Sequence, residues 1–337
     1  MSRSICGEKM RVWYDACTGK HVRFGTAIAR RLRKDGHEVV FTTREHPDTL
    51  ALARLLGENP IVVGKYNPTS LLSRLEESAN RMLQFSKMFK DNPPDIAVSH
   101  QSVELCRVAF GLGVPVIVTA DTPHAEAVNR LTVPLSSVLL VSEAIPASLY
   151  KRYGARKIVR FRGVDEVAWT ENFDHAPTLG FKRPLIVVRQ IETKAAYGVG
   201  EEDFTVEAAH KLVSLGTVVF LARYSKSKYK NVIVMKEFVD SANLAGHADL
   251  VVSVGGTIAR EAALQGTPSI VISQFGKIHV NEYLSKKKFP LFIVKPARIM
   301  EYAKRYLGKR FDVKTKFAEL ENPVDIIAQI ISEKQFA

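Results

Sequence analysis

The chain has 337 residues, of which 46% are hydrophobic and 25% are charged. This length exceeds what one ordinary core holds, so the sequence predicts two domains with a cleft between them. The composition is that of a soluble globular protein, which excludes disordered, collagen-like and fibrous classes.

The formal net charge of +13 is the unusual bulk property. Such a charge attracts nucleic acid, an anionic membrane surface or a phosphorylated substrate. The basic residues form short runs, such as 30–31, 226–230 and 286–288, and do not gather in one tail. Because no nucleic-acid-binding module accompanies them, nucleic acid is the least expected partner. Two interpretations of the charge remain: a basic surface that only contacts solvent, and a surface that binds a membrane or a phosphate-rich partner.

The sequence offers no targeting or membrane-spanning segment. No window approaches the roughly 18 consecutive apolar residues of a membrane span, and the first residues lack the apolar stretch of a signal peptide. We therefore expect a cytoplasmic protein and leave open a peripheral contact with the inner face of the membrane. Cys6, Cys17 and Cys106 show no CxxC spacing, so we expect free thiols.

Residues 1–162 repeat one pattern, a short β-branched run followed by a longer amphipathic stretch. This pattern predicts βαβ units and a parallel sheet. Gly36 falls where the end of a helix requires a left-handed residue. Strands are expected at 10–16, 37–44, 61–64, 95–100, 115–121 and 137–142, and helices at 24–34 and 70–91.

Residues 163–183 carry glycine and proline with little periodicity, which predicts a linker. The alternation restarts in residues 184–322 and predicts a second domain, and residues 323–337 are expected to form a helix at the domain junction. Strands are expected at 184–190, 217–223, 231–237, 249–256, 268–274 and 291–295, and helices at 206–215, 241–246 and 258–264. The expected fold is α/β, with two Rossmann-like, doubly wound domains whose ligands bind beyond the carboxyl ends of the strands.

The strongest local signal is the pair Gly255-Gly256, between a strand that ends at Val254 and a helix that begins near Ile258. Glycines let the backbone approach a phosphate, and the free amides and dipole of a helix N-terminus favour negative charge. Thr257 is expected to cap the helix with its hydroxyl. A plain strand-to-helix turn is the alternative.

Three charged residues extend this site. Arg260 is expected to reach a phosphate, and Glu261 is expected to accept hydrogen bonds from the two hydroxyls of a ribose. Arg189 ends the strand 184–190 and is expected to bind a pyrophosphate through two N–H groups, with an interdomain salt bridge as the alternative. The absence of a P-loop lysine and of GxGxxG spacing disfavours ATPase and dinucleotide sites, so a sugar nucleotide fits better.

A second constellation follows the first strand, where Asp15, Thr18, Gly19, Lys20 and His21 lie at a strand-to-helix junction. Because a histidine ordinarily titrates near pH 6.5, His21 is a candidate acid or base that Asp15 would orient. The alternative is that Asp15 and Thr18 only cap the helix and that His21 lies at the surface.

Further polar residues follow later strands of the first half. His100 comes after 95–99, and Asp121 and His124 come after 115–120, so all three are expected to line the acceptor side. Asp121 is a candidate base and His124 a candidate sugar contact, although either residue could simply close a loop. Zinc bound by His21, His100 and His124 is conceivable, but no short ligand spacing supports it, and no metal or cofactor is expected.

These motifs resemble those of a known family. The segments DACTGKHVRF, DIAVSHQSVEL, DTPHAEAVNR and GGTIAREAALQGTP look like the archaeal family known as domain of unknown function 354, over nearly the whole chain. That family is similar to GT-B proteins such as the MurG-type lipid-linked N-acetylglucosamine transferases and the UDP-N-acetylglucosamine 2-epimerases. The resemblance implies a GT-B fold and a UDP-sugar ligand.

The resemblance has two departures. The turn from Thr18 to His21 is similar to the glycine-rich first loop of the transferases with its histidine, but Lys20 replaces a glycine. The Gly255-Gly256 turn with Glu261 resembles the nucleotide-binding turn of the epimerases, but their second adjacent glutamate is absent. Since an epimerase that expels and re-adds UDP would use several carboxylates, this absence favours transfer.

The leading hypothesis is a metal-independent glycosyltransferase. Its second domain would bind a UDP-sugar and its first an unknown acceptor, phosphorylated or lipid-linked. The helix dipole and the arginines would offset the charge of the departing diphosphate, and Asp121 or His21 would remove the acceptor proton. A UDP-N-acetylglucosamine 2-epimerase-like enzyme and a non-catalytic polyanion-binding protein are the alternatives.

Overall fold

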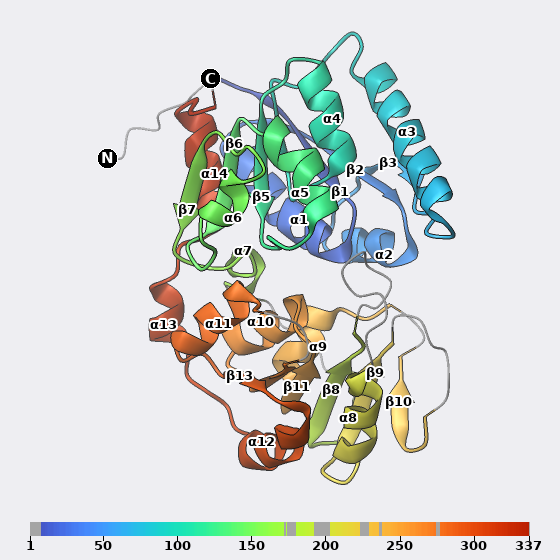
Figure 1. The fold of residues 1–337 in the computed structure, drawn as a ribbon, viewed down its shortest axis with the longest axis vertical. Helices are drawn as coiled ribbons and strands as arrows, with labels where there is room; N and C mark the ends of the chain where they lie inside the picture. Colours follow the sequence, from blue (N-terminus) through green and yellow to red (C-terminus); the bar gives the residue numbers. More distant parts are fainter. Residues whose placement is uncertain are drawn as a thin grey trace. The chain divides into compact units, whose positions relative to one another are not determined.

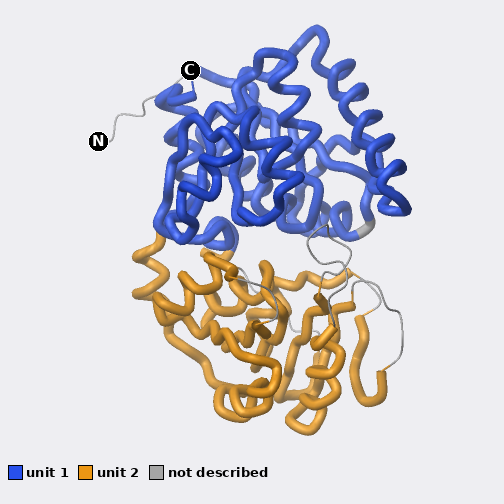
Figure 2. The backbone as a smooth tube through the Cα atoms, in the orientation of Figure 1, with its two compact units in different colours: residues 1–169, 321–337 blue, residues 170–320 orange. Residues whose placement is uncertain are grey.

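The structure is a computed structural model, and it describes residues 8–171, 173, 180–191, 203–222, 229–235, 238–273 and 277–336. Cys6, part of the expected linker and part of the basic run 226–230 lie outside these residues. The chain divides into two compact units (Figure 2): unit 1 comprises residues 1–169 and 321–337, and unit 2 comprises residues 170–320. The linker was expected to begin at residue 163, but residues 163–169 belong to unit 1. Val164 and Val167 in this segment are buried.

Unit 1 is built on a parallel sheet of seven strands in the part of the chain that the structure describes (Figure 1), in the order β3-β2-β1-β4-β5-β6-β7. The chain therefore winds outward from β1 in one direction and from β4 in the other. The strands are β1 (Arg11–Ala16), β2 (Glu38–Glu45), β3 (Ile61–Lys65), β4 (Ile96–Ser99), β5 (Val116–Ala120), β6 (Val138–Ser142) and β7 (Ile158–Phe161). β7 is the strand that the sequence analysis did not predict.

Helices cover both faces of this sheet. α1, α2 and α14 pack together, while α3, α4 and α5 form a second group. Figure 1 shows this arrangement. The helices are α1 (Gly19–Lys34), α2 (Pro47–Leu55), α3 (Leu71–Met88), α4 (Val103–Gly111), α5 (Glu126–Thr132), α6 (Ser148–Lys151), α7 (Val167–Thr170) and α14 (Pro323–Ser332), with a 3-10 turn η1 at Val133–Leu135.

Strand β1 is buried on both faces, which explains its apolar sequence. Successive side chains of a strand point to opposite faces. Val12 and Tyr14 accordingly join the core beneath α1, while Trp13 contacts the rings of Phe85 and Phe89 on α3, with centroids 4.8 and 4.6 Å apart. The strand is therefore fixed by both helical layers.

Helix α1 begins at Gly19, five residues before the expected start, because the Thr18 hydroxyl accepts a hydrogen bond from the His21 amide and caps the helix. The helix ends as expected, with Gly36 in the left-handed region at a φ of 93°. Thr18 thus fills the structural role that the sequence analysis left open for it.

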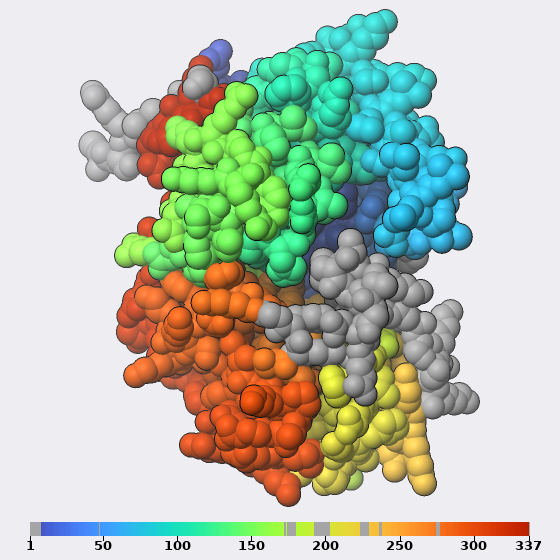
Figure 3. Space-filling model, viewed as in Figure 1, coloured from blue at the N-terminus to red at the C-terminus, as the bar shows by residue number. Residues whose placement is uncertain are grey.

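Helix α3 has two contrasting faces. Its inward face supplies Arg81 and Phe85, both buried. Its outward face lies at the surface of unit 1 (Figure 3), where Leu71 and Leu75 are 83% and 65% exposed. Only the inward face therefore bears on the site described below.

Helix α14 returns the end of the chain to unit 1. Asn322 caps it by accepting a hydrogen bond from the Val324 amide, and Pro323 occupies the first helical position. Val324, Ile327 and Ile331 enter the same core as α1. The closing helix expected at the domain junction is thus part of the unit 1 core.

Unit 2 is also doubly wound. Within its described residues one parallel six-stranded sheet runs in the order β10-β9-β8-β11-β12-β13, so the winding reverses between β8 and β11. The strands are β8 (Leu185–Arg189), β9 (Thr217–Leu221), β10 (Val232–Val234), β11 (Leu250–Ser253), β12 (Ser269–Ile272) and β13 (Leu291–Val294). The helices are α8 (Phe204–Leu212), α9 (Ser241–His247), α10 (Thr257–Leu264), α11 (His279–Lys286), α12 (Ile299–Tyr306) and α13 (Lys314–Ala318), with a 3-10 turn η2 at Pro296–Arg298.

Among the residues that the structure describes, none of the helices combines the length and the apolar character that crossing a bilayer requires.

The contact between α1 and β1 leads to a stability prediction. A Cβ atom on Gly25 would lie 2.2 Å from Cε1 of Tyr14 and 2.8 Å from Cζ of Phe41, both buried rings. We therefore expect Gly25→Ala to lower the free energy of unfolding of unit 1 by about 1–3 kcal/mol. Both tryptophans, Trp13 and Trp169, lie in unit 1, so urea unfolding followed by their fluorescence reports on this unit.

Gly19→Ala on the same helix is the matched control. A Cβ there would meet its nearest atom, Cδ2 of Leu52, at an ordinary 3.6 Å. We expect this variant to unfold within about 0.5 kcal/mol of the wild type. Equal effects of the two substitutions would contradict the close packing at Gly25.

Candidate functional site

The candidate site of unit 1 lies where the order of the strands in the sheet reverses, between β1 and β4. In a doubly wound sheet the loops that follow the two strands at the reversal diverge and leave room for a ligand. Here those strands are β1 and β4, and their carboxyl ends carry Asp15 and Ser99. The segment from Thr18 to His21, together with His100, follows them directly.

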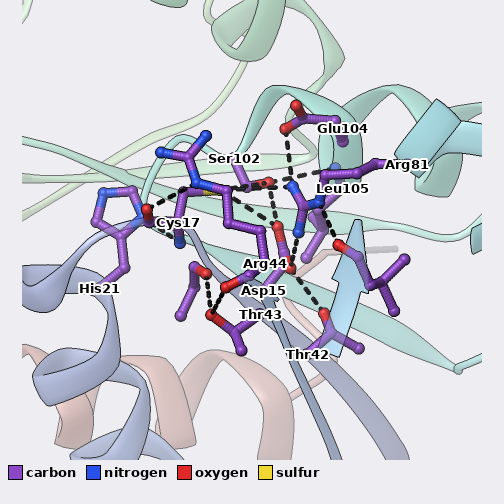
Figure 4. Close-up of polar contacts among 12 residues, drawn as sticks. Asp15, Cys17, His21, Thr42, Thr43, Arg44, Arg81, Ser102, Glu104 and Leu105 are labelled. Atoms are coloured by element: carbon purple, nitrogen blue, oxygen red, sulfur yellow. Dashed lines mark hydrogen bonds and ion pairs between the residues drawn. The ribbon is translucent and has the colours of Figure 1, made fainter. Parts of the chain in front are cut away.

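Asp15 is fully buried and belongs to a hydrogen-bonded network (Figure 4). Its carboxylate accepts hydrogen bonds from the hydroxyls of Ser102 and Thr42, at 2.6 and 2.8 Å, and from Nη2 of Arg81 at 2.8 Å. The expectation that Asp15 orients His21 is therefore wrong, because its oxygens are engaged by these other partners. Asp15 instead ties β1 to β2, α3 and the start of α4.

Arg81 completes this network from α3. It is 1% exposed, and its Nε donates to the carbonyl of Val63 at 2.8 Å. Its Nη1 lies 3.3 Å from a carboxylate oxygen of Glu104. The guanidinium therefore compensates two carboxylates that would otherwise be buried as bare charges.

The residues between β1 and α1 contact this network through Cys17. Nε of Arg44 donates to the carbonyl of Cys17 at 3.1 Å, and Sγ of Cys17 lies 3.5 Å from Asp15. Burial, followed by the charge of Asp15, raises the pKa of the Cys17 thiol to about 12. Cys17 therefore stays protonated at neutral pH and is a structural residue, not a nucleophile.

His21 is held by the same loop. Its Nδ1 accepts a hydrogen bond from the amide of Cys17 at 3.3 Å, so the neutral ring carries its proton on Nε2. Burial, and then the charges of His100 and Lys20, lower the pKa of His21 well below its ordinary value. At neutral pH His21 is thus an uncharged hydrogen-bond donor through Nε2, which argues against the role of base.

Lys20 is the centre of the charged cluster at this edge. Its Nζ lies 2.5 Å from Asp121, 2.8 Å from Asp165 and 3.8 Å from Glu166. His100 adjoins the same acids, with Nε2 3.6 Å from Asp121. We call Lys20, His100, Asp121, Asp165 and Glu166 the Lys20 cluster.

The structure thus brings Lys20 and His21, in the first turn of α1, together with His100 and Asp121, which follow β4 and β5. The rings of His21 and His100 meet edge to face, with their centroids 5.0 Å apart. Asp165 and Glu166 were missed because they lie in the segment expected as a linker. The available signal was the short run Ile158–Phe161 just before them, which is apolar except for Arg160 and forms β7.

His124 and Gly19 lie at the margin of this site. His124 is exposed just before α5, and burial lowers its pKa while the charge of Asp121 opposes that change. Gly19 is the first residue of α1, and no backbone strain requires a glycine there. These positions are compatible with contacts to an acceptor.

The Lys20 cluster also contains the residue types of a metal site, since ligand atoms of His100, Asp121 and Asp165 lie within 4.8 Å of one another. Lys20 Nζ contacts both carboxylates, so a metal ion would have to compete with its ammonium. The geometry therefore fits a lysine as the resident cation. His21 and His124, expected with His100 as zinc ligands, are not part of this group.

The candidate site of unit 2 also lies at a reversal of the sheet. Arg189 ends β8, and β11, its neighbour, leads into Gly255 and Gly256. These glycines have φ angles of 126° and 95°, in the region that L side chains rarely adopt, so glycine is required at both positions. The amide of Gly255 donates to the hydroxyl of Ser253 at 3.4 Å.

Helix α10 begins directly after this turn. Gly256 is the N-cap, and no side-chain hydrogen bond caps the helix among the described residues. The expectation that the Thr257 hydroxyl is the cap is wrong, because Thr257 is already the first helical residue. The N-terminal amides and the positive end of the helix dipole are therefore suited to bind an anion at this turn.

Arg260 and Glu261 lie deeper than the sequence suggested, with exposed fractions of 3% and 1%. Nη1 of Arg260 donates to Oδ1 of Asn281, on α11, at 3.0 Å. Asn281 was missed because nothing in the sequence links it to a residue 21 positions away. In this structure Arg260 is thus engaged inside unit 2.

Two doubly wound α/β units are the architecture of the GT-B class, and solved GT-B structures are similar over nearly the whole chain. A UDP-GlcNAc 2-epimerase of Methanocaldococcus jannaschii, in complex with UDP-GlcNAc and UDP, has a TM-score of 0.73 at 16% identity, covering 96% of this chain and 100% of that chain. A spinosyn forosaminyltransferase has a TM-score of 0.61 at 16% identity, covering 98% and 100%. The predicted GT-B fold is confirmed.

The particular family follows from sequence. The chain belongs to the family described as Protein of unknown function (DUF354), whose model matches residues 10–335. An uncharacterized protein of Methanocaldococcus jannaschii is 30% identical over 333 residues, which cover 94% of this chain and 96% of that protein. The resemblance drawn from the sequence motifs is confirmed.

The burial of Arg81 leads to a prediction about stability. Arg81→Met leaves Asp15 as an uncompensated buried charge, so we expect the free energy of unfolding of unit 1 to fall by about 3–5 kcal/mol. Arg130→Met, which breaks the exposed pair with Glu126, is the control and should cost about 0–1 kcal/mol. Urea unfolding of both variants tests this, and equal effects would refute the importance of the buried pair.

The lowered pKa of His21 leads to a prediction about pH. In the unfolded chain His21 takes up a proton near its ordinary value of 6.5, whereas in the folded protein it does so only at lower pH. Its contribution to stability is therefore present above pH 6.5 and is lost as the pH falls through the folded pKa.

Two-dimensional NMR of the histidine ring carbons tests this directly. The signal missing from the spectrum of His21→Gln identifies the residue, and we expect it to titrate at lower pH in the folded protein than in urea. We also expect the stability of His21→Gln to depend less on pH below 6.5 than that of the wild type. Titration of the folded signal at the unfolded pKa would contradict the burial of a neutral ring.

Proposed function

We propose that the protein is an enzyme that acts on a nucleotide-linked sugar, and that it transfers the sugar from a UDP-sugar to an acceptor without a bound metal ion. The observation that carries this proposal is the turn of Gly255 and Gly256 before the N-terminus of α10, at the reversal of the unit 2 sheet. The similar epimerase structure is described as holding UDP-GlcNAc and UDP, which supports the same ligand class here.

A departing UDP needs its negative charge stabilised. The N-terminal amides of α10 supply partial positive charge, and Arg189 ends the strand beside β11. Helix amides and a guanidinium together perform the task that a divalent cation performs in metal-dependent enzymes. We therefore assign the diphosphate to unit 2, with Gly255, Gly256 and Thr257 closest to it.

The acceptor is assigned to unit 1 and its Lys20 cluster. Asp121 takes the proton of the acceptor hydroxyl as that oxygen attacks the anomeric carbon, and the bond from this carbon to the diphosphate breaks. His21 donates a hydrogen bond through Nε2 instead of taking the proton, because its Nδ1 is engaged by Cys17. Lys20 offsets the charge of Asp121 and Asp165 before the proton moves.

A second candidate is a 2-epimerase-like conversion of the sugar nucleotide without an acceptor. The Gly255-Gly256 turn lacks the second adjacent glutamate of the epimerases, which favoured transfer over this reaction. Asp121, Asp165 and Glu166 surround Lys20 in unit 1, which provides several carboxylates after all. This observation keeps the epimerase reaction as the alternative use of the same residues.

Calorimetric titration with UDP and UDP-N-acetylglucosamine tests the ligand class. We expect wild-type binding, and we expect Thr257→Asp to weaken UDP binding at least about tenfold relative to Thr257→Asn, because only the aspartate adds a negative charge at the start of α10. The two side chains have the same shape, so the pair isolates charge. Absence of binding at millimolar UDP would refute the proposal, and equal affinities of the pair would remove the diphosphate from this helix end.

Proton NMR of UDP-N-acetylglucosamine with the protein and no acceptor separates the two reactions. If the protein binds UDP-N-acetylglucosamine and the signals of this substrate nevertheless stay unchanged, the result supports transfer. Formation of a new sugar or of free UDP, lost in Asp121→Asn, supports the epimerase-like reaction instead.

A further inference from the structure

Unit 2 contains a cavity of about 320 Å³ beside the proposed diphosphate turn. Val254, which precedes the turn, and Ser273 both line this cavity. The lining residues before and on α11 are Lys277, Ile278, Asn281 and Glu282. Further lining residues come from the ends of β12 and β13, so the cavity lies between the start of α11, these strand ends and the residue that follows β11.

Asn281 is a lining residue with a buried side-chain donor that has no hydrogen-bond partner among the described residues. Its side chain is fully buried, and Oδ1 accepts the hydrogen bond from Arg260. No acceptor among the described residues reaches Nδ2. Burying an amide donor without a partner costs about 1–3 kcal/mol, so such a donor in a native protein calls for an explanation.

The orientation of this amide follows from chemistry. A guanidinium has only donors, so the atom of Asn281 that faces Arg260 must be the carbonyl oxygen Oδ1. Nδ2 therefore lies on the opposite side of the amide and presents its N–H groups away from Arg260. Arg260 determines which way the donor points.

The donor lies beside the first glycine of the turn. A Cβ atom on Gly255 would be 3.5 Å from Nδ2 of Asn281 and 2.7 Å from Cδ1 of Ile278. Any side chain at position 255 would therefore crowd the space in front of the amide. The glycine leaves Nδ2 next to the backbone that leads into α10.

We propose that Nδ2 of Asn281 donates a hydrogen bond to an oxygen of the diphosphate group of the ligand, and that Arg260 is a positioning residue that orients this amide. This inference rests on the proposed function and deepens it, because it adds a side-chain donor from α11 to the backbone amides of α10. It also replaces the direct contact between Arg260 and a phosphate that the sequence suggested.

The test compares Asn281→Asp with the wild type in calorimetric titrations of UDP, uridine and inorganic pyrophosphate. Aspartate has the shape of asparagine and still accepts from Arg260, but it replaces the donor by a charged acceptor. We expect the affinity for UDP and pyrophosphate to fall at least about tenfold, and that for uridine to change less than about twofold. Ser285→Asp, one turn further along α11, is the charge-matched control and should leave all three affinities unchanged.

Arg260→Met tests the positioning role. We expect it to weaken UDP binding and to spare uridine binding, and we expect the neutral change Asn281→Ser to add little in the double variant because both changes remove the same oriented amide donor. A merely structural role of Arg260 would instead lower the affinity for uridine and UDP together. Thermal unfolding of each variant identifies any that does not fold, and Asn281→Ser, which also removes the amide donor, then takes the place of Asn281→Asp.

The outcomes separate this inference from the proposed function. Wild-type UDP binding that is unchanged in Asn281→Asp, or reduced equally for uridine, overturns the inference and leaves the proposed function standing. Pyrophosphate binding that depends on Asn281, without any binding of uridine nucleotides, supports the inference and overturns the proposed function. Absence of binding of all three ligands to the wild type overturns both.

Discussion

The ion pair between Asp15 and Arg81 is the constraint on which the unit 1 site depends. Neither charge is reachable by water, and each would be very unfavourable alone in the interior. Their mutual contact forces β1 and α3 to keep one separation, and the hydroxyls of Thr42 and Ser102 tie β2 and α4 to the same point. Helix α1, whose first turn carries Lys20 and His21, begins four residues after Asp15, and its start is therefore held in place by this network.

The two candidate sites handle charge in opposite ways. In unit 1, cations of the chain itself, Lys20 and Arg81, already form ion pairs with the buried carboxylates of Asp165 and Asp15. In unit 2, the first amides of α10 and the amide of Asn281 are donors that the described residues leave for another group. A site in which carboxylates and a lysine already contact one another suits proton transfer, whereas a site with unfilled donors suits the recognition of an anion.

The sequence predicted those features that depend on local pattern. Apolar runs such as Val116–Ala120 became buried parallel strands, and the left-handed Gly36 followed from the end of a helix. It missed β7, whose four residues include the exposed Arg160, and with that strand it missed Asp165. It also misread Asp15, because the partner that decides its role is 66 positions away and only the folded sheet brings them together.

Helix α14 gives the chain an order of assembly. Unit 2 is continuous in sequence, whereas unit 1 is built from the first 169 residues and the last 17. During synthesis residues 1–169 therefore leave the ribosome before α14 can cover α1, since Ile327 and Ile331 follow the whole of unit 2 in the chain. Unit 2 can therefore finish folding before unit 1, whose core stays incomplete until α14 has been synthesised.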